Sequence, residues 1–251
     1  MTPFSWPCPW CCSTTWWNRK GVEALSPRNW LPWTAFVAVL LALFLAFLYA
    51  PPDANLGDTQ RIFYFHVASA WTGLLAFTVV CVAGVAYLRG GAPRWDRLGL
   101  ASAEVGLLFI TMAVLTGSIW ARFAWGTWWE WEPRLTSAFV LWLMYAATLL
   151  VRNLVEDPAR RARYAAVFGI IAFADVPIVF MSVRWWRSVH PVVVSAAGLE
   201  LEPPMVLAMV VAVVAFTLLY VLLVGERMHL AALEEELAEC KRALREGERV
   251  R

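Results

Sequence analysis

Two histidines are the residues of this 251-residue sequence best suited to chemistry. The chain has three histidines, and two of them, His66 and His190, fall beside the ends of long apolar runs. Imidazole is a common axial ligand of haem iron, so this pair predicts coordination of one iron by both side chains. A lone histidine is more often structural or solvated than a ligand, and His229, in a charged tail, is interpreted as a surface residue.

A tryptophan-rich segment, WGTWWEWEPR at residues 125–134, lies between the two histidines. Five of the 16 tryptophans fall between positions 120 and 131, and an interfacial aromatic belt does not explain the charged residues among them. At helical spacing, positions 125, 128, 129 and 132 share one face, where flat indoles would cover a porphyrin. The predicted haem-contacting residues of this segment are Trp120, Trp125, Gly126, Trp128, Trp129, Trp131 and Glu132.

Haem propionates need cationic partners, and arginine is the residue preferred for carboxylates. Arg61, five residues before His66, and Arg134, which closes the tryptophan-rich segment, are the predicted propionate ligands. The sequence has no C-x-x-C-H motif, so the expected cofactor is haem b held without covalent bonds. It also has no P-loop, so the chain is not expected to hydrolyse nucleotides by itself.

The elements that must position these residues are membrane-spanning helices. Hydrophobic residues make up 61% of the chain and charged residues 16%, with a mean hydropathy of +0.60. The apolar runs are continuous and close to the roughly 20 residues that a hydrocarbon span requires, so the predicted fold is an all-α integral membrane protein with six helices. The predicted helices cover residues 33–49, 67–88, 98–119, 135–151, 164–183 and 205–224.

The distribution of positive charge predicts the orientation of these helices. With both termini in the cytoplasm, 16 Lys and Arg residues lie inside and five outside, as the positive-inside rule requires. This orientation puts His66, His190 and the tryptophan-rich segment between helices 3 and 4 on the external face. The predicted organisation is a cytoplasmic segment 1–29, a membrane domain 30–225 with its motif at 120–137, and a cytoplasmic amphipathic tail 226–251.

Two features have no assigned role in this interpretation. A cluster of Cys8, Cys11 and Cys12 precedes the first helix but lacks a second ligand pair at zinc-like spacing. Asp175 lies inside the fifth predicted helix near Pro177, and an intramembrane acid is a functional candidate by default. No partner for it follows from the sequence.

The segment WGTWWEWEPRLTS (125–137) resembles the tryptophan-rich "WWD" signature of haem-handling proteins in cytochrome c maturation. Together with QRIFYFH (60–66) and SVRWWRSVHP (182–191), it is similar to the CcmC branch over about residues 30 to 225. One departure is that Glu132, which is one methylene longer and keeps the charge, stands where the signature usually has Asp.

The resemblance implies that haem is bound at the periplasmic face of the bacterial inner membrane, with His66 and His190 as axial ligands. It implies presentation of haem to a membrane-anchored CcmE-like chaperone, beside CcmA-like and CcmB-like ABC transporter subunits and a small CcmD-like protein. An assembly factor is thereby favoured over an enzyme, and the bilayer, not nucleic acid, is the other expected partner. The alternatives are a haem- or quinone-linked electron-transfer subunit and a haem permease.

Overall fold

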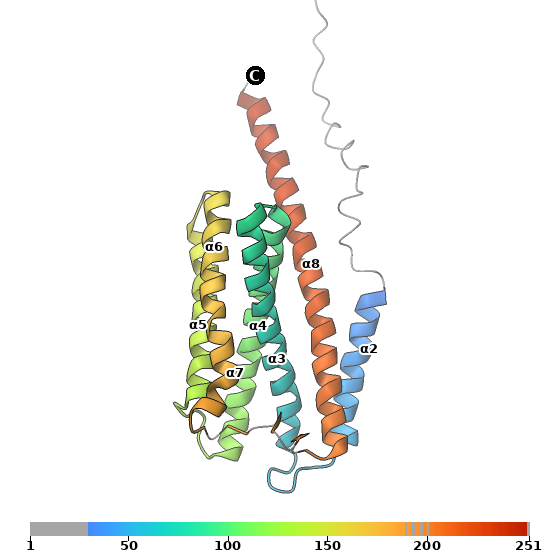
Figure 1. Cartoon of the computed structure of the whole chain (residues 1–251). Helices are drawn as coiled ribbons and strands as arrows, with labels where there is room; N and C mark the ends of the chain where they lie inside the picture. Colours follow the sequence, from blue (N-terminus) through green and yellow to red (C-terminus); the bar gives the residue numbers. More distant parts are fainter. Residues whose placement is uncertain (1–29, 189, 192–193, 196–197, 200, 250–251) are drawn as a thin grey trace, which may run out of the picture.

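The computed structural model describes residues 30–188, 190–191, 194–195, 198–199 and 201–249, and these residues are almost entirely helical (Figure 1). A π-helical turn, η4 (Leu45–Tyr49), continues the first helix, and a two-residue antiparallel pair, β1 (Val194–Ser195) and β2 (Gly198–Leu199), lies between the last two. The helices are α2 (Trp30–Phe44), α3 (Gln60–Gly90), α4 (Pro93–Ala124), α5 (Pro133–Leu154), α6 (Pro158–Phe173), α7 (Asp175–Trp185) and α8 (Pro203–Arg249).

Six helical segments of the described chain are long and apolar enough to cross a membrane, which confirms the predicted architecture. Helices α6 and α7 form one of these segments, since they are separated only at Ala174. The segments extend beyond the predicted apolar runs, because polar and aromatic residues continue the helices at their ends. The segments are Trp30–Tyr49, Gln60–Gly90, Pro93–Ala124, Pro133–Leu154, Pro158–Trp185 and Pro203–Glu246.

Prolines and one glycine explain where several helices begin and end. α4, α5, α6 and α8 each begin at a proline, whose fixed φ suits the first helical position and whose missing N–H has no helical partner there. α3 ends before Gly91, which adopts φ 64° and donates its N–H to the carbonyl of Tyr87. A left-handed residue of this kind closes a helix at little steric cost when it is glycine.

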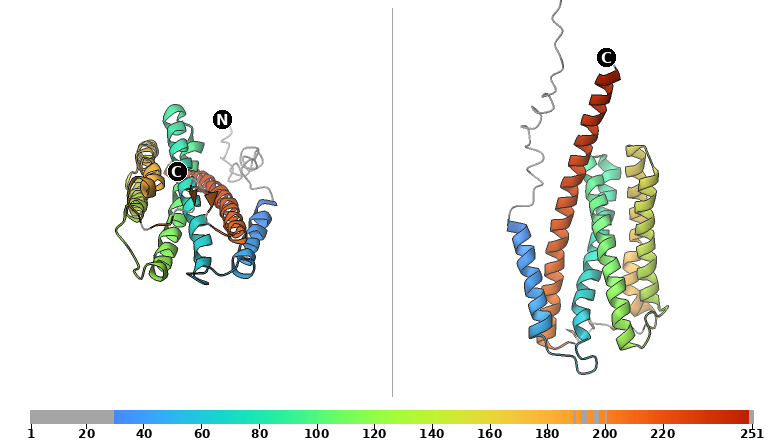
Figure 2. Two further views of the ribbon diagram at one scale, coloured as in Figure 1. Left: turned by 60° about the horizontal axis from the view of Figure 1, so that its bottom comes forward. Right: turned by 180° about the vertical axis from the view of Figure 1, so that it is seen from behind.

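Helices α3 and α4 pack against each other at the centre of the bundle (Figure 1). α2 and α8 lie on one side of this pair and α5, α6 and α7 on the other, as both views in Figure 2 show. Two buried clusters follow from this arrangement, one joining α2, α3, α4 and α8 and the other joining α3 to α7. The central pair therefore contributes to both halves of the core.

The alternating direction of the helices separates two ends of the bundle. The start of α2 and the far end of α8 lie toward one end, and the connections α4–α5 and α7–α8 lie at the other, which we call the site end (Figure 1). Both histidines and the tryptophan-rich segment are thus at the same end, as the predicted topology requires. The cysteines at positions 8, 11 and 12 lie outside the described residues.

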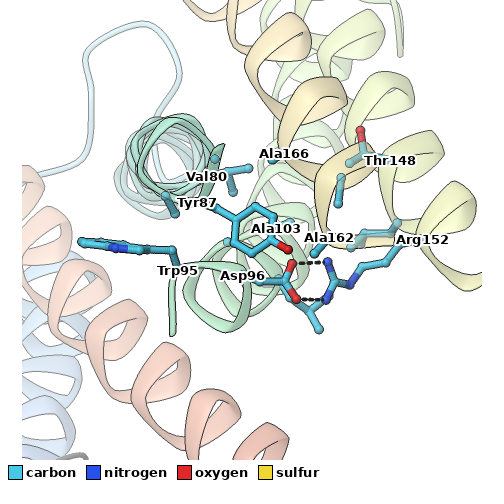
Figure 3. Close-up of a pocket in the computed structure, with 15 residues that line it drawn as sticks. Val80, Tyr87, Trp95, Asp96, Ala103, Thr148, Arg152, Ala162 and Ala166 are labelled. Carbon is cyan, nitrogen blue, oxygen red and sulfur yellow. Dashed lines mark hydrogen bonds and ion pairs between the residues drawn. The ribbon is translucent and has the colours of Figure 1, made fainter. Parts of the chain in front are cut away.

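The opposite end of the bundle holds a small cavity between α3, α4, α5 and α6 (Figure 3). Its empty volume is about 370 Å³, and small residues such as Ala83 and Gly84 form much of its wall. Asp96 of α4 and Arg152 of α5 join across it through two bonds of 2.6 Å each. A paired contact of this kind is geometrically specific, and it fixes the far ends of the two helices that begin or end at the tryptophan-rich segment.

Helix α8 continues as one helix from its membrane-spanning part to Arg249. Arg227, just beyond the apolar part, forms an ion pair with Glu104 of α4, with Nε and Oε2 2.5 Å apart. Beyond it, the predicted apolar face carries four exposed leucines, Leu230, Leu233, Leu237 and Leu244. The predicted cytoplasmic tail is therefore an extension of the last membrane helix in the described part of the chain.

Candidate functional site: a two-histidine cavity

His66 is held by a helix and by the neighbouring helix. The sequence placed it just outside its helix, but α3 already begins at Gln60, so His66 lies in the second helical turn. Its Nδ1 is 2.9 Å from the carbonyl oxygen of Ala113 in α4. A carbonyl only accepts, so Nδ1 carries the proton and Nε2 is left unprotonated, the state that a metal ligand needs.

Gly117 of α4 provides the space that the His66 ring occupies. A Cβ at this position would lie 2.7 Å from Cε1 and 3.1 Å from Nδ1 of His66. Real Cβ atoms do not approach other atoms this closely, so the imidazole could not keep its position beside any larger residue. The glycine therefore allows the ring to pack directly on the α4 backbone.

His190 lies in the connection between α7 and α8. Its Nδ1 is 3.1 Å from the carbonyl oxygen of Pro191, and its backbone N–H donates to Oγ of Ser188. Burial, and after it the positive charge of Arg134, lower the pKa of His190 to about 3. The imidazole is therefore neutral at ordinary pH, with Nε2 unprotonated.

The two imidazoles lie close together at the site end. Their ring centres are 6.4 Å apart with an angle of 36° between the rings. An imidazole nitrogen lies about 2 Å from a metal that it binds, and the ring centre is about 1.2 Å further, so two rings on opposite sides of one iron have centres about 6.4 Å apart. The separation of His66 and His190 fits this requirement.

The tryptophan-rich segment forms a loop, so the expectation of a shared helical face was wrong. α4 ends at Ala124 and α5 begins only at Pro133. Gly126 adopts φ 78°, a left-handed conformation that a helix cannot contain, and its carbonyl accepts a hydrogen bond from Arg122. A second bond, 2.9 Å from Oγ of Ser118 to the carbonyl of Trp128, ties the loop to α4.

The loop divides its tryptophans between a cavity and the surface. Trp125 and Trp129, together with Trp120 at the end of α4, line the cavity that contains the two histidines. The Trp125 ring stands edge-on to His190, with ring centres 6.4 Å apart. Trp128 and Trp131 are 59% and 74% exposed and do not line the cavity.

The cavity at the site end is large and mostly apolar. Its empty volume is about 850 Å³, which includes the part of the cavity that is open to solvent. Besides the residues already named, its walls are formed by α3, α4, α5 and α7. These further lining residues are Phe63, Ala70, Leu74, Ile110, Val114, Leu135, Ala138 and Val179.

Arg134 supplies positive charge inside this cavity. It is the second residue of α5 and lines the cavity with His66 and His190. Among the residues that the structure describes, its guanidinium forms no ion pair within 4 Å and no hydrogen bond. A partly buried guanidinium without an ion pair is suited to an anionic ligand, with which it can form charge-assisted hydrogen bonds.

Arg61 and Glu132 occupy positions that differ from those expected for haem contacts. Arg61 donates to the carbonyl oxygens of Ala46 and Phe47, at 2.7 and 2.5 Å, and pairs with Asp58 at 2.8 Å. It therefore joins α3 to the π-helical end of the first span and does not line the cavity. Glu132 caps α5 by accepting the N–H of Leu135 at 2.8 Å, and it also lies outside the cavity wall.

Three further residues, two beside the histidines and one away from the cavity, complete the description of the site. Gly117 and Ser188 support the two histidines, and neither was predicted, because both act through contacts between segments far apart in sequence. Asp175 begins α7 at the break after α6, away from the cavity wall. Its Oδ2 is buried without a hydrogen-bond partner in the described part of the chain.

The fold and the site together define a polytopic α-helical membrane protein with a two-histidine, tryptophan-lined cavity at one end. Residues 14–243 match the family model described as CcmC, heme exporter protein C. The chain therefore belongs to the heme exporter protein C family.

Individual relatives support this assignment. The chain is 38% identical to heme exporter protein C of Bradyrhizobium diazoefficiens over 225 residues, which cover 88% of this chain and 83% of the relative. It is 31% identical to heme exporter protein C of Escherichia coli K12, covering 69% of this chain and 75% of the relative. The protein of the same name from Haemophilus influenzae is 28% identical, covering 82% and 85%.

Proposed function

We propose that this chain binds one haem b, without covalent attachment, in the cavity at the site end and delivers it for cytochrome c maturation. The observation that carries the proposal is the 6.4 Å separation of the His66 and His190 ring centres inside that cavity. In this assignment Nε2 of each imidazole ligates the iron, and the Nδ1 protons are held by the carbonyls of Ala113 and Pro191.

The remaining cavity residues suit the rest of a haem molecule. The indoles of Trp120, Trp125 and Trp129 offer flat apolar surface to the porphyrin. The guanidinium of Arg134 suits a propionate, with which it forms charge-assisted hydrogen bonds. Arg61 is a weaker candidate for such a contact, because its side chain is already bonded to two carbonyls and to Asp58.

In this proposal haem is the cargo that the protein binds and passes on, and it is not a resident cofactor. Haem handling agrees with the name of the relatives, heme exporter protein C, which also fits a place beside ABC transporter subunits of the CcmA and CcmB type. We propose further that a CcmE-like chaperone accepts the haem and that a small CcmD-like protein accompanies the complex. The exposed Trp128 and Trp131, beside the cavity but outside it, offer a contact surface for the acceptor.

The proposed location is the bacterial inner membrane, with the cavity facing the periplasm. Six membrane-length helices agree with a multi-pass protein. The positive-inside rule supports this orientation, because 16 Lys and Arg residues fall in the sequence segments predicted to be cytoplasmic, against five in the predicted external segments. A lipid-facing surface, not a water-facing one, also explains the many exposed apolar residues along α2 and α5.

The test is a haem-binding assay on protein purified in detergent. Wild-type protein should show a Soret band and the low-spin electron paramagnetic resonance signal of an iron with two imidazole ligands. The double variant His66→Ala/His190→Ala should lose both, whereas His229→Ala, which removes the third histidine, should retain them. Unchanged haem content and spin state in the double variant would refute the ligation.

A further inference from the structure

We infer that Glu132 and Ser188 form a hydrogen-bonded link that positions His190 in the connection between α7 and α8. Glu132 acts through this link and does not touch haem. The inference deepens the proposed function, because it rests on ligation by His190. It concerns which residue keeps this histidine in place for the metal. The argument follows three consecutive contacts from the start of α5 to the backbone of His190.

The first contact fixes Glu132 itself. The residue has extended backbone, with φ −86° and ψ 160°, and Pro133 follows as the first residue of α5. Its Oε1 accepts the N–H of Leu135 at 2.8 Å. This N-cap bond holds the carboxylate at the positive end of the helix, where a negative charge is stabilised.

The second and third contacts carry this anchor to the histidine. The Ser188 hydroxyl donates to Oε2 of Glu132, and its oxygen accepts the backbone N–H of His190 at 3.1 Å. Both carboxylate oxygens of Glu132 are thus used, one on each segment. The helix start and the His190 backbone are joined through one side chain and one hydroxyl.

The link matters because the two histidines are supported differently. His66 is part of α3, and its ring is also bonded to the α4 backbone. His190 lies outside any helix, and among the residues that the structure describes its ring is hydrogen-bonded only to the neighbouring Pro191. A metal ligand must be held within about 0.5 Å of its productive position, so a loop ligand needs an anchor on a rigid element. Glu132 supplies that anchor, two residues before Arg134 in the same helix start.

The length of the side chain at position 132 determines which variants test the link. Aspartate at position 132 can still cap α5 but is shorter by one carbon–carbon bond, about 1.5 Å, and cannot serve both segments at once. Glutamine keeps the length, since its oxygen can accept from Leu135 and its amide can donate to Ser188. Glu132→Asp and Ser188→Ala should therefore behave alike, and Glu132→Gln should resemble the wild type.

The matched control is a second hydroxyl–carboxylate pair at the same end of the molecule. Oγ1 of Thr127 donates to Oε1 of Glu130 at 3.0 Å, and both residues are exposed and touch neither histidine. Thr127→Ala removes a bond of the same kind. It should leave the haem spectrum unchanged.

The experiment compares these variants as purified, haem-loaded protein in detergent. The readouts are the low-spin fraction by electron paramagnetic resonance and the rate of haem transfer to an apomyoglobin trap. Ser188→Ala and Glu132→Asp should shift iron from low to high spin and release haem roughly 5- to 10-fold faster, as the loss of one hydrogen bond implies. The melting temperature of the protein without haem should change little in both.

The outcomes separate this inference from the proposed function. Wild-type spin state and release rate in both Ser188→Ala and Glu132→Asp would overturn the link, while the histidine ligation stands. An unchanged spectrum in His190→Ala alone would instead remove His190 as ligand and thereby the proposed ligation. If Ser188→Ala does not fold, Glu132→Asp, which retains the cap, gives the same decision.

Discussion

Replacing Gly117 by alanine should displace His66 and disrupt haem ligation from one side. The added Cβ would lie 2.7 Å from Cε1 of the imidazole, whereas ordinary contact begins at 3.4 Å. The ring must therefore move by about 0.7 Å, while metal–ligand distances tolerate only about 0.2 Å. The same movement strains the 2.9 Å bond from Nδ1 to the carbonyl of Ala113. We expect haem binding to weaken roughly 10- to 100-fold, the range typical when support for a metal ligand is lost.

Gly99 provides the matched control for this substitution. It belongs to the same helix, α4, and a Cβ at this position would meet only the Cβ of Ala83, at 3.7 Å, which is ordinary contact. Both variants raise helix propensity equally, by about 1 kcal/mol. The assay is a haem titration followed by the Soret band and by electron paramagnetic resonance. A Gly117→Ala protein that keeps wild-type affinity and low-spin iron would show that the position of His66 is not critical, and the reasoning would fail.

Three further substitutions test other parts of the structure. Arg134→Gln should weaken haem binding roughly 10- to 150-fold, because charge-assisted bonds contribute about 1.5–3 kcal/mol; dimethyl-ester haem, which lacks propionate charge, should show no such difference in titration. Trp129→Ala should weaken haem binding about 10-fold, whereas Trp131→Ala, on an exposed residue, should bind haem normally and lose only transfer to the acceptor. Arg152→Ala should lower the free energy of unfolding by about 3–5 kcal/mol, since it leaves the carboxylate of Asp96 without its ion-pair partner. A double variant that also removes the charge of Asp96 should recover part of the lost melting temperature, and the haem spectrum should be unaffected.

The architecture could be predicted because a membrane leaves few choices for an apolar chain. Each long apolar run has to satisfy its own backbone hydrogen bonds, so six runs become six spanning helices. The alternation of their directions then brings His66 and His190 to the same end, whatever the details of packing. What composition could not show is where a helix begins beyond its apolar part. Gln60 and Arg61 are polar and still helical, and this moves His66 from the expected loop into α3.

The tryptophan-rich segment forms a loop despite its helical periodicity, because residue spacing alone does not establish a helix. Positions 125, 128, 129 and 132 have helical periodicity, but Gly126 and Pro133 favour a turn and a new helix start. A positive φ at glycine and a proline at the first helical position are both local signals. These local signals favour a loop and outweigh the helical periodicity of the tryptophans.

The roles of Arg61 and Glu132 could not be read from the sequence for a different reason. Their partners lie 15 and 14 residues away for Arg61 and 56 residues away for the second oxygen of Glu132. Charge and proximity to a motif suggest a ligand contact, but they do not reveal that a side chain is already occupied by the protein. Arg134 shows the opposite case. Its position in the motif predicted an anion partner, and its guanidinium has no protein partner among the described residues while lining the cavity.

The contrast between Arg134 and Glu132 gives a physical meaning to the acid that ends the tryptophan-rich signature. Both side chains come from the beginning of α5: Arg134, its second residue, lines the cavity, and Glu132, its N-cap, accepts from Ser188. The beginning of α5 therefore sets the distance between Arg134 and His190, because the side chain of Arg134 and the link to His190 both start from this short stretch of backbone. The extra methylene of Glu132, compared with the usual Asp, increases the reach of the carboxylate by about 1.5 Å. A chain with aspartate at this position must bring its histidine loop that much closer to the helix to make the same link.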